Sequence, residues 1–190
     1  MPEVNILEDY PQPTEPRFVG RDMRTISHRI AAVKRDKYFF DGDRNFGYGG
    51  FKYDGRWVPI AERIIRHYKL ESSSRLLHLN CEKGFLLNDL KQLNPSLQAI
   101  GTETSDYAIT HAMKEIKGSI TKISSIKLPF PDNSFNLVIG LSYVYIHSLK
   151  GAIQALKEIA RVSTGDSFIT LATYETCLLY TSDAADDLLC

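Results

Sequence analysis

The stretch RLLHLNCEKGFLL, residues 75–87, has residue types and spacing that suit a cofactor-binding turn. Its first apolar run meets a short polar break, Asn80–Gly84, and a second apolar run begins at Phe85. That pattern is typical of a buried strand that turns into a helix. Such a junction can bind a nucleotide-like cofactor through the backbone N–H groups of the helix N-terminus. Because cofactor turns normally carry several glycines and this one has only Gly84, an ordinary strand-to-helix turn is the alternative.

Glu103 is the second candidate for cofactor chemistry. It stands at the end of the next apolar run, and Thr104 or Ser105 can cap the helix that follows. A carboxylate there can accept hydrogen bonds from the ribose hydroxyls of a nucleotide, each worth about 1.5–3 kcal/mol. Taken alone, a solvated acidic residue near a helix N-terminus is the simpler explanation. The spacing favours the cofactor, because Glu103 lies 19 residues beyond Gly84, close to the dinucleotide-binding pattern.

Three more polar residues follow later strands. Ser124 and Ser125 come directly after the third predicted strand, where they could meet an adenine edge. A turn with local hydroxyl bonds explains them equally well. His147 comes just past the fourth predicted strand, and its side chain has the pKa range of a general base. A histidine bonded to backbone at the strand end is the alternative for that residue.

Strands and helices alternate from Arg75 onward. The predicted strands are 75–80, 97–103, 119–123, 135–142 and 166–173. The predicted helices are 22–35, 58–68, 84–93, 105–114 and 149–162. This alternation predicts an α/β fold whose parallel sheet is covered on both faces. Right-handed crossovers then place the strand ends on one rim, where ligands of open α/β sheets bind.

The segment before the first strand differs in composition. Residues 1–20 carry four prolines and predict a loose N-terminal arm. Residues 37–57, KYFFDGDRNFGYGGFKYDGRW, are rich in aromatic residues and glycines, so we expect an ordered loop that covers another part of the molecule. Tyr48, Tyr53 and Trp57 are candidates for a lid over an acceptor pocket, with packing against the sheet edge as the alternative for each. Residues 21–70 are therefore expected to form an extension of helices and an aromatic cap.

The overall composition excludes several classes of function. The 23 basic residues balance the 23 acidic ones, so no global field attracts nucleic acid or an anionic membrane. No apolar run approaches the roughly 20 residues that span a bilayer, and the acidic, proline-rich N-terminus does not read as a signal peptide. The three cysteines form no disulfide framework and have no metal-ligand spacing. A cytoplasmic protein without a metal site is the expectation.

The features above occur in a recognisable order. The junction at Cys81–Gly84, the acidic strand end, LPFPDNSFN and ALKEIARVSTGDSFITLAT together resemble class I S-adenosylmethionine-dependent methyltransferases. The segment YFFDGDRNFGYGGFKYDGRWVPIAERIIRHY resembles the N-terminal signature of one bacterial subgroup of that family. The resemblance covers roughly residues 37–176 and implies a seven-stranded Rossmann-like sheet, of which residues 71–176 would supply about five strands. Residues 177–190 resemble a translated sequencing-adapter tail and are expected to be non-native, with the native chain cut short near Thr176.

The resemblance implies S-adenosylmethionine as cofactor and assigns residues to its site. Substrate-facing residues are expected at His147, the candidate base, and at Tyr143. In the loop, His78, Asn80 and Glu82 stand where the family carries an acid and two glycines. The cofactor contacts that follow from the resemblance are Asn80, Cys81, Gly84, Glu103, Ser124, Ser125 and Leu141.

The altered loop leaves the function open at this point. Glu82 adds a negative charge where the methionine carboxylate would approach, which costs about 1 kcal/mol in water-like surroundings and a few times more in a partly buried cleft. Its side chain could instead swing outward into solvent. The first hypothesis is methyl transfer to a small-molecule or carbohydrate acceptor, and the alternative is a non-catalytic binding module. A nicotinamide-dinucleotide enzyme is disfavoured because the sequence has no G-x-G-x-x-G.

Overall fold

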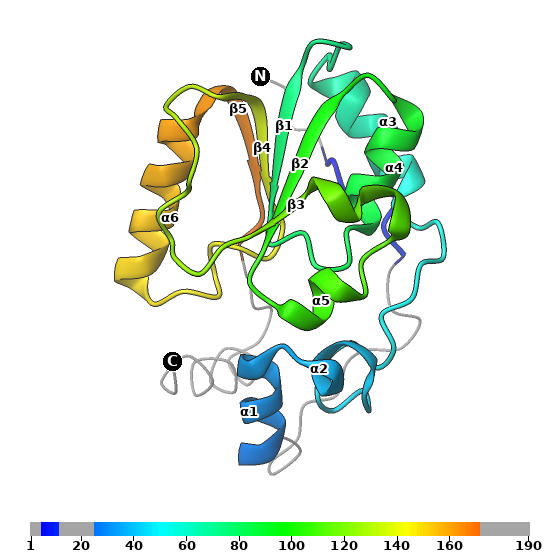
Figure 1. Cartoon of the computed structure of the whole chain (residues 1–190), viewed down its shortest axis with the longest axis vertical. Helices are drawn as coiled ribbons and strands as arrows, with labels where there is room; N and C mark the ends of the chain where they lie inside the picture. Colours follow the sequence, from blue (N-terminus) through cyan, green and yellow to red (C-terminus); the bar gives the residue numbers. More distant parts are fainter. Residues whose placement is uncertain (1–4, 12–24, 172–190) are drawn as a thin grey trace.

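The computed structural model describes residues 5–11 and 25–171, and helices cover a central sheet in it (Figure 1). The helices are α1 (Ile26–Lys34), α2 (Lys37–Asp41), α3 (Val58–His67), α4 (Phe85–Leu93), α5 (Asp106–Thr110), the 3₁₀ helix η1 (Lys114–Ser119) and α6 (Leu149–Val162). The strands are β1 (Arg75–Leu79), β2 (Gln98–Glu103), β3 (Ile120–Lys122), β4 (Phe135–Gly140) and β5 (Ser163–Ile169).

The five strands form one sheet in the order β3-β2-β1-β4-β5, and every neighbouring pair is parallel. The first strand in the chain therefore lies at the centre, where Leu77 pairs with Ile100 on one side and with Val138 on the other. This confirms the predicted α/β architecture, since parallel neighbours require crossovers that place helices over the sheet.

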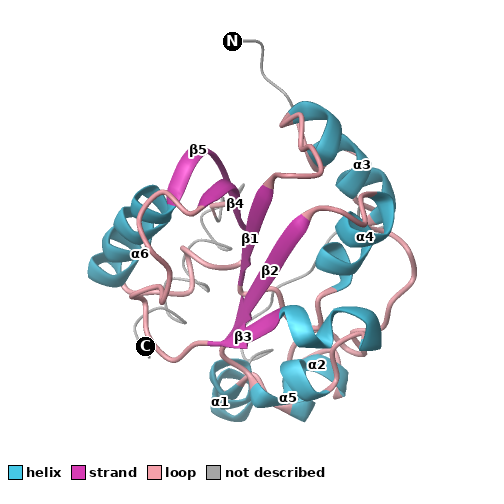
Figure 2. Ribbon diagram, turned by 45° about the horizontal axis from the view of Figure 1, so that its top comes forward, coloured by secondary structure: helices cyan, strands magenta, loops and turns pink. Residues whose placement is uncertain are grey.

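Both faces of the sheet are covered, as Figure 2 shows with α6 on one side and α3 and α4 on the other. Successive side chains of a strand point to opposite faces, so β1 contributes to two cores. Leu76 packs with Ile60 and Ile64 of α3, while Leu77 packs with Ile159 of α6. All five of these side chains are at most 3% exposed. Apolar residues on both faces of β1 explain why its sequence reads as an almost continuous apolar run.

Local signals in the sequence start the helices that frame the rim. The Ser105 side chain accepts a hydrogen bond from the Ala108 N–H at the start of α5, and Ser148 accepts one from Gly151 at the start of α6. Helix α4 instead begins after Gly84, whose φ of 77° is left-handed. The carboxyl ends of β1 and β2 are thus followed by helices, α4 after a left-handed glycine and α5 after a capping serine.

Two predicted boundaries are wrong, and a third is tested only in part. The helix expected over 105–114 ends at Thr110, because the chain then bends so that the Met113 N–H can bond the Lys83 carbonyl, and η1 follows. Strand β5 begins at Ser163, directly after α6, rather than at residue 166. The helix expected over 22–35 is seen only as Ile26–Lys34, since residues 12–24 lie outside the described part of the chain.

The segment before the sheet forms two packed pieces. Residues 5–11 belong to the predicted loose arm, yet Ile6 is only 3% exposed and Arg63 of α3 pairs with Asp9, so this piece is packed against α3. Residues 25–57, which we call the cap, contain α1 and α2 and lie beyond the strand ends next to α5 (Figure 1). The predicted non-native tail, residues 177–190, lies outside the described residues.

Candidate functional site

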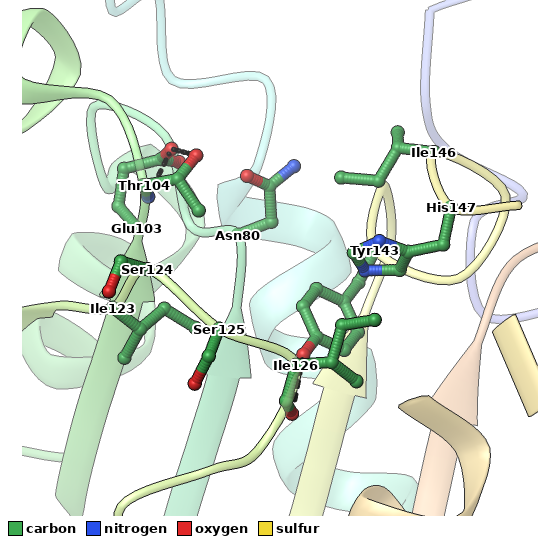
Figure 3. A pocket seen from close by; sticks show the side chains of 10 residues that line it. All are labelled: Asn80, Glu103, Thr104, Ile123, Ser124, Ser125, Ile126, Tyr143, Ile146 and His147. Carbon is green, nitrogen blue, oxygen red and sulfur yellow. Dashed lines mark hydrogen bonds between the residues drawn. The ribbon is translucent and has the colours of Figure 1, made fainter. Parts of the chain in front are cut away.

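A cavity of about 310 Å³ opens at the carboxyl end of the sheet (Figure 3). Its lining comes from the ends of β1 and β2 and from the segments that follow β3 and β4. The lining residues are Asn80, Glu103, Thr104, Ile123, Ser124, Ser125, Ile126, Tyr143, Ile146 and His147. Six of the residues predicted from the sequence therefore meet here, although they are spread over 68 positions of the chain, from 80 to 147.

The loop after β1 keeps the backbone geometry of a glycine-rich turn. Asn80, Glu82 and Gly84 have φ values of 53°, 57° and 77°, so every second residue is left-handed. A residue with a side chain pays about 1–2 kcal/mol for that conformation, and asparagine tolerates it better than most. The alternation matches the positions where the resembled family carries glycines. The backbone therefore follows the path of a glycine-rich turn, although two of these three positions carry side chains.

Glu103 stands at the predicted place, but backbone groups already bind its carboxylate. Its Oε2 accepts the Glu82 N–H at 2.8 Å, and its Oε1 accepts the N–H groups of Thr104 and Ser105 at 2.8 and 2.9 Å. The Thr104 hydroxyl donates a fourth bond at 3.2 Å. A carboxylate has about four acceptor positions, so ribose hydroxyls could bind Glu103 only by replacing one of these donors. The Thr104 hydroxyl makes the longest of the four bonds and is the replaceable one.

Glu82 does not swing outward into solvent, which corrects that expectation. It is only 9% exposed, and its Oε1 accepts a hydrogen bond from the Tyr48 hydroxyl. The Arg35 guanidinium lies 3.5 Å from the same oxygen and 3.8 Å from Oε2 of Glu103. Burial raises the pKa of Glu82, while Arg35 and Tyr48 oppose that rise. The charge that was expected to face the cofactor is therefore paired within the protein.

The far end of the cavity carries the candidate base. The Nε2 atom of His147 is buried and has no hydrogen-bond partner among the described residues. Its ring meets the Tyr143 ring edge-on, with the centroids 5.2 Å apart. Burial lowers the pKa of His147 below 6.5, so the imidazole is neutral near pH 7 and can accept a proton. The Tyr143 hydroxyl points to the Ile126 carbonyl at 3.4 Å, and burial raises its pKa to about 12.

The two serines lie at the opposite side of the cavity from His147 (Figure 3). Ser124 and Ser125 are exposed at its mouth, and the Ser125 hydroxyl donates to the Lys127 carbonyl at 3.1 Å. That bond is the local turn contact considered as the alternative for Ser125. The hydroxyl of Ser124 makes no such turn contact in the described chain, so it remains available to a ligand.

A second cavity of about 200 Å³ adjoins the first, and Asn80 lines both. The Asn80 amide donates to the Ser142 carbonyl at 2.7 Å, but its Oδ1 has no partner among the described residues. The same holds for Nδ1 of His78, which is 4% exposed and whose pKa burial lowers to about 4. The lining residues are Leu7, Tyr10, Tyr48, Phe51, Trp57, His78, Asn80, Cys81, Glu82, Phe85, Leu86, Leu141, Ser142 and Thr170.

Two of the predicted site residues lie outside both cavities. A Cβ added to Gly84 would lie 2.3 Å from Cδ1 of Ile116, so this glycine packs against η1. Tyr53 donates its hydroxyl to Asp89 at 2.7 Å instead of covering a pocket. Tyr48 and Trp57, by contrast, line the second cavity together with Cys81 and Leu141.

Sequence reasoning missed two kinds of residue. Ile123 and Ile126 form apolar walls of the first cavity, and their position beside the predicted serines was a usable signal. Arg35 and Asp41 approach the loop from the cap, 40 or more positions away in the chain. No spacing rule predicts those contacts, because they depend on how the cap docks.

Comparisons with known proteins identify the class of fold. Residues 77–170 match the family model described as Methyltransferase domain. A suspected S-adenosyl-L-methionine-dependent methyltransferase from Methanococcus maripaludis aligns with a TM-score of 0.55 and 16% identity, over 92% of this chain and 75% of that one. The MccD protein aligns at 0.52 and 22% identity, over 64% and 57% of the two chains. A suspected methyltransferase of an antibiotic biosynthesis pathway from Anabaena variabilis aligns at 0.51 and 18% identity, over 70% and 55%.

The chain thus spans little more than half the length of the MccD and Anabaena proteins. No curated protein matches it significantly. The all-parallel sheet with flanking helices is the Rossmann-like α/β methyltransferase fold. Over residues 77–170, the family model and the fold both indicate a domain similar to methyltransferases, and neither supports a non-catalytic module.

The described residues lack two further features. They hold no group of three or more histidine, cysteine or acidic side chains that could bind a metal ion. None of the helices in the described ranges is long and apolar enough to cross a bilayer.

The first cavity fits an adenosyl ligand. Its volume of about 310 Å³ lies within the roughly 300–1,000 Å³ range of small-molecule sites. Ile123 and Ile126 offer apolar surface to a base, and the unpartnered Oδ1 of Asn80 offers a buried acceptor. A buried polar atom without a partner is costly, and a ligand donor can satisfy it.

Proposed function

We propose that this protein transfers a methyl group from S-adenosylmethionine to a small-molecule or carbohydrate acceptor. The observation that carries the proposal is the first cavity, where Asn80, Glu103, Ser124 and His147 line one space at the carboxyl ends of parallel strands. Ligands of open α/β sheets bind at that edge. The matched methyltransferase domain supports the same reaction class.

One group of cavity residues would hold the nucleoside of the cofactor, and another would hold its amino-acid end. Glu103, with Thr104 as the exchangeable donor, would hold the ribose, and Ser124 would meet the adenine edge. The unpartnered atoms of His78 and Asn80 would meet the amino-acid end of the cofactor in the second cavity. That arrangement leaves the end of the first cavity beside Tyr143 and His147 for the acceptor.

When bound, the cofactor supplies a methyl group on an already activated sulfonium, so correct alignment provides most of the acceleration. The protein has to hold the acceptor in line and remove its proton. His147 suits that second task, because its Nε2 is unpartnered and the lowered pKa keeps it neutral. Nε2 would take the proton of an acceptor hydroxyl or amine as the new bond to carbon forms.

The experiment follows product formation with panels of acceptors. The full chain is incubated with S-adenosylmethionine and with sugars, phenols or small amines, and S-adenosylhomocysteine is measured by mass spectrometry. We expect turnover with at least one class, and we expect His147→Gln to lower kcat by about 10²–10⁴-fold while cofactor binding persists. His67→Gln, an exposed histidine at the end of α3, is the matched control and should leave the rate unchanged.

The outcome against the proposal is equally concrete. A folded protein that neither binds the cofactor nor forms the product with any panel contradicts it. A His147→Gln variant as active as His67→Gln would remove His147 from the reaction while leaving the reaction class in place.

A further inference from the structure

We propose that the cap, residues 25–57, is a working part of the cofactor site, in which Arg35 and Tyr48 are positioning residues that make Glu82 tolerable in the loop. The inference rests on the proposed function, since it concerns how that site holds its ligand. The inference goes beyond the proposed function, because it assigns a role in cofactor binding to residues that belong to no cofactor-binding motif of the sequence.

The first observation is how the cap receives Glu82. The left-handed φ of 57° at this residue sends a charged side chain into a site that a glycine would leave empty. Tyr48 donates its hydroxyl to Oε1, and Arg35 lies 3.5 Å from the same atom. Arg35 also lies 3.8 Å from the buried carboxylate of Glu103. One guanidinium therefore stands between two buried carboxylates that would otherwise repel each other.

The neighbouring loop residue is bound to the cap with the opposite polarity. Lys83 is 6% exposed, and its Nζ donates to both oxygens of Asp41 at 2.8 and 2.7 Å. It also donates to the Phe51 carbonyl at 2.9 Å, and Asp41 receives a further bond from the Tyr107 hydroxyl at 2.8 Å. A loop carboxylate, Glu82, thus faces a cap cation, Arg35, and the next loop residue, the cation Lys83, faces a cap carboxylate, Asp41. This crossed pair fixes the register of the cap on the loop, because a shift by one residue would oppose like charges.

Aromatic stacking continues the same contact. The rings of Tyr48 and Phe51 stack with centroids 4.3 Å apart, and Phe51 stacks on Phe85 of α4 at 4.6 Å. Phe40 of α2 stacks on Tyr107 of α5 at 6.1 Å. The cap is therefore held against the loop and against the first turns of the two helices that begin at the rim. Charged and apolar contacts together make the loop and the cap one structural unit.

The contacts of the Arg35 guanidinium indicate that its polar partners come from the loop and from Glu103. Its Nε is buried and has no hydrogen-bond partner among the described residues, and its ion pairs at 3.5 and 3.8 Å are loose. It leans on the rings of Phe39 and Phe40, with its Cζ 4.9 and 5.4 Å from their centroids. Of the two carboxylates that Arg35 faces, Glu82 is the nearer, at 3.5 Å against 3.8 Å for Glu103. Most of the effect of removing Arg35 should therefore be lost when the Glu82 carboxylate is already absent.

A double-mutant cycle tests this dependence. The dissociation constant for S-adenosylhomocysteine is measured by calorimetry for wild type, Arg35→Ala, Glu82→Gly and the double variant. We expect Arg35→Ala to weaken binding at least tenfold, and the same substitution in the Glu82→Gly background to weaken it less than twofold. Arg35→Lys should restore part of the affinity. Arg66→Ala, which removes an exposed arginine in the last turn of α3, outside the cap and outside the lining of both cavities, is the control and should change nothing.

Each result decides something. A wild type that binds while the two substitutions act additively, or an Arg66→Ala loss as large as that of Arg35→Ala, overturns the inference and leaves the proposed function standing. A folded wild type that binds no adenosyl ligand defeats both. If Arg35→Ala does not fold, Tyr48→Phe replaces it in the cycle, because that variant keeps the stacked ring and loses only the bond to Glu82. Additive behaviour there counts equally against the inference.

Discussion

Lys83→Met should destabilise the fold by about 2–4 kcal/mol. Methionine keeps most of the length and apolar volume of the lysine stem, so the change removes mainly the charge. Breaking a buried ion pair by deleting one partner costs about 3–5 kcal/mol, because the other charge stays behind unpaired. Asp41 moderates the loss, since its side chain is 24% exposed and keeps bonds from the Tyr107 hydroxyl and the Phe51 N–H. These remaining donors lower the expected cost from that range to about 2–4 kcal/mol.

The assay is equilibrium unfolding in urea, followed by the fluorescence of Trp57, the single tryptophan. The control is Lys122→Met. Its ammonium pairs with Asp106 at 2.6 Å, but the two side chains are 52% and 76% exposed, so that pair is worth about 0–1 kcal/mol. The two variants therefore differ in burial while sharing the chemistry of the change.

A second substitution checks the cause. If the stranded Asp41 carboxylate produces the loss, Asp41→Asn in the Lys83→Met background should return part of the stability. The reasoning is refuted if Lys83→Met costs no more than Lys122→Met, or if the added Asp41→Asn makes the protein weaker still. The first result would mean that the contact between cap and loop contributes little to the fold, and the second that the unpaired Asp41 carboxylate is not the cause of the loss.

Three more expectations concern single residues. His78→Leu should make the stability of the protein less dependent on pH in acid. Burial lowers the pKa of His78 to about 4, so the wild-type free energy of unfolding falls by about 3 kcal/mol between pH 6.5 and 4, because the unfolded chain binds the proton first. Urea titrations across that range should show that the variant does not lose this stability. Wild-type kcat/KM should be flat above about pH 6.5 and fall at lower pH, where the neutral His147 is lost, and a profile that stays flat in acid speaks against that base. Gly84→Ala should cost about 1–3 kcal/mol in urea unfolding, because its Cβ would meet Ile116 and its φ is 77°; an unchanged midpoint would show that the loop adapts.

The sheet was predictable where apolar runs are bounded by capping residues. β1 to β4 fall within or next to their predicted ranges, and α6 matches its range of 149–162 because Ser148 caps an amphipathic run. β5 was misplaced because its first residues, Ser163–Asp166, are polar and read as a turn. They lie in a strand because β4 supplies hydrogen-bonding partners on that side, which is tertiary information.

The candidate site divides in the same way. Asn80, Glu103, Ser124 and His147 meet in one cavity because each lies at the end of a strand of a parallel sheet or in the segment that follows it, and topology alone brings such positions together. The partners of Glu82 could not be foreseen. Tyr48 is 34 positions away in the chain and belongs to the cap, whose docking no local pattern encodes.

One titration tests the central claim most directly. S-adenosylmethionine is added to the full chain, and binding is followed by calorimetry and by the fluorescence of Trp57. Trp57 and Asn80 both line the second cavity. Saturable binding at one site is expected, with Kd below about 1 mM, which corresponds to roughly −4 kcal/mol or better. The Asn80→Ala substitution should weaken this binding. A folded chain that gives neither heat nor fluorescence change at millimolar ligand contradicts the account.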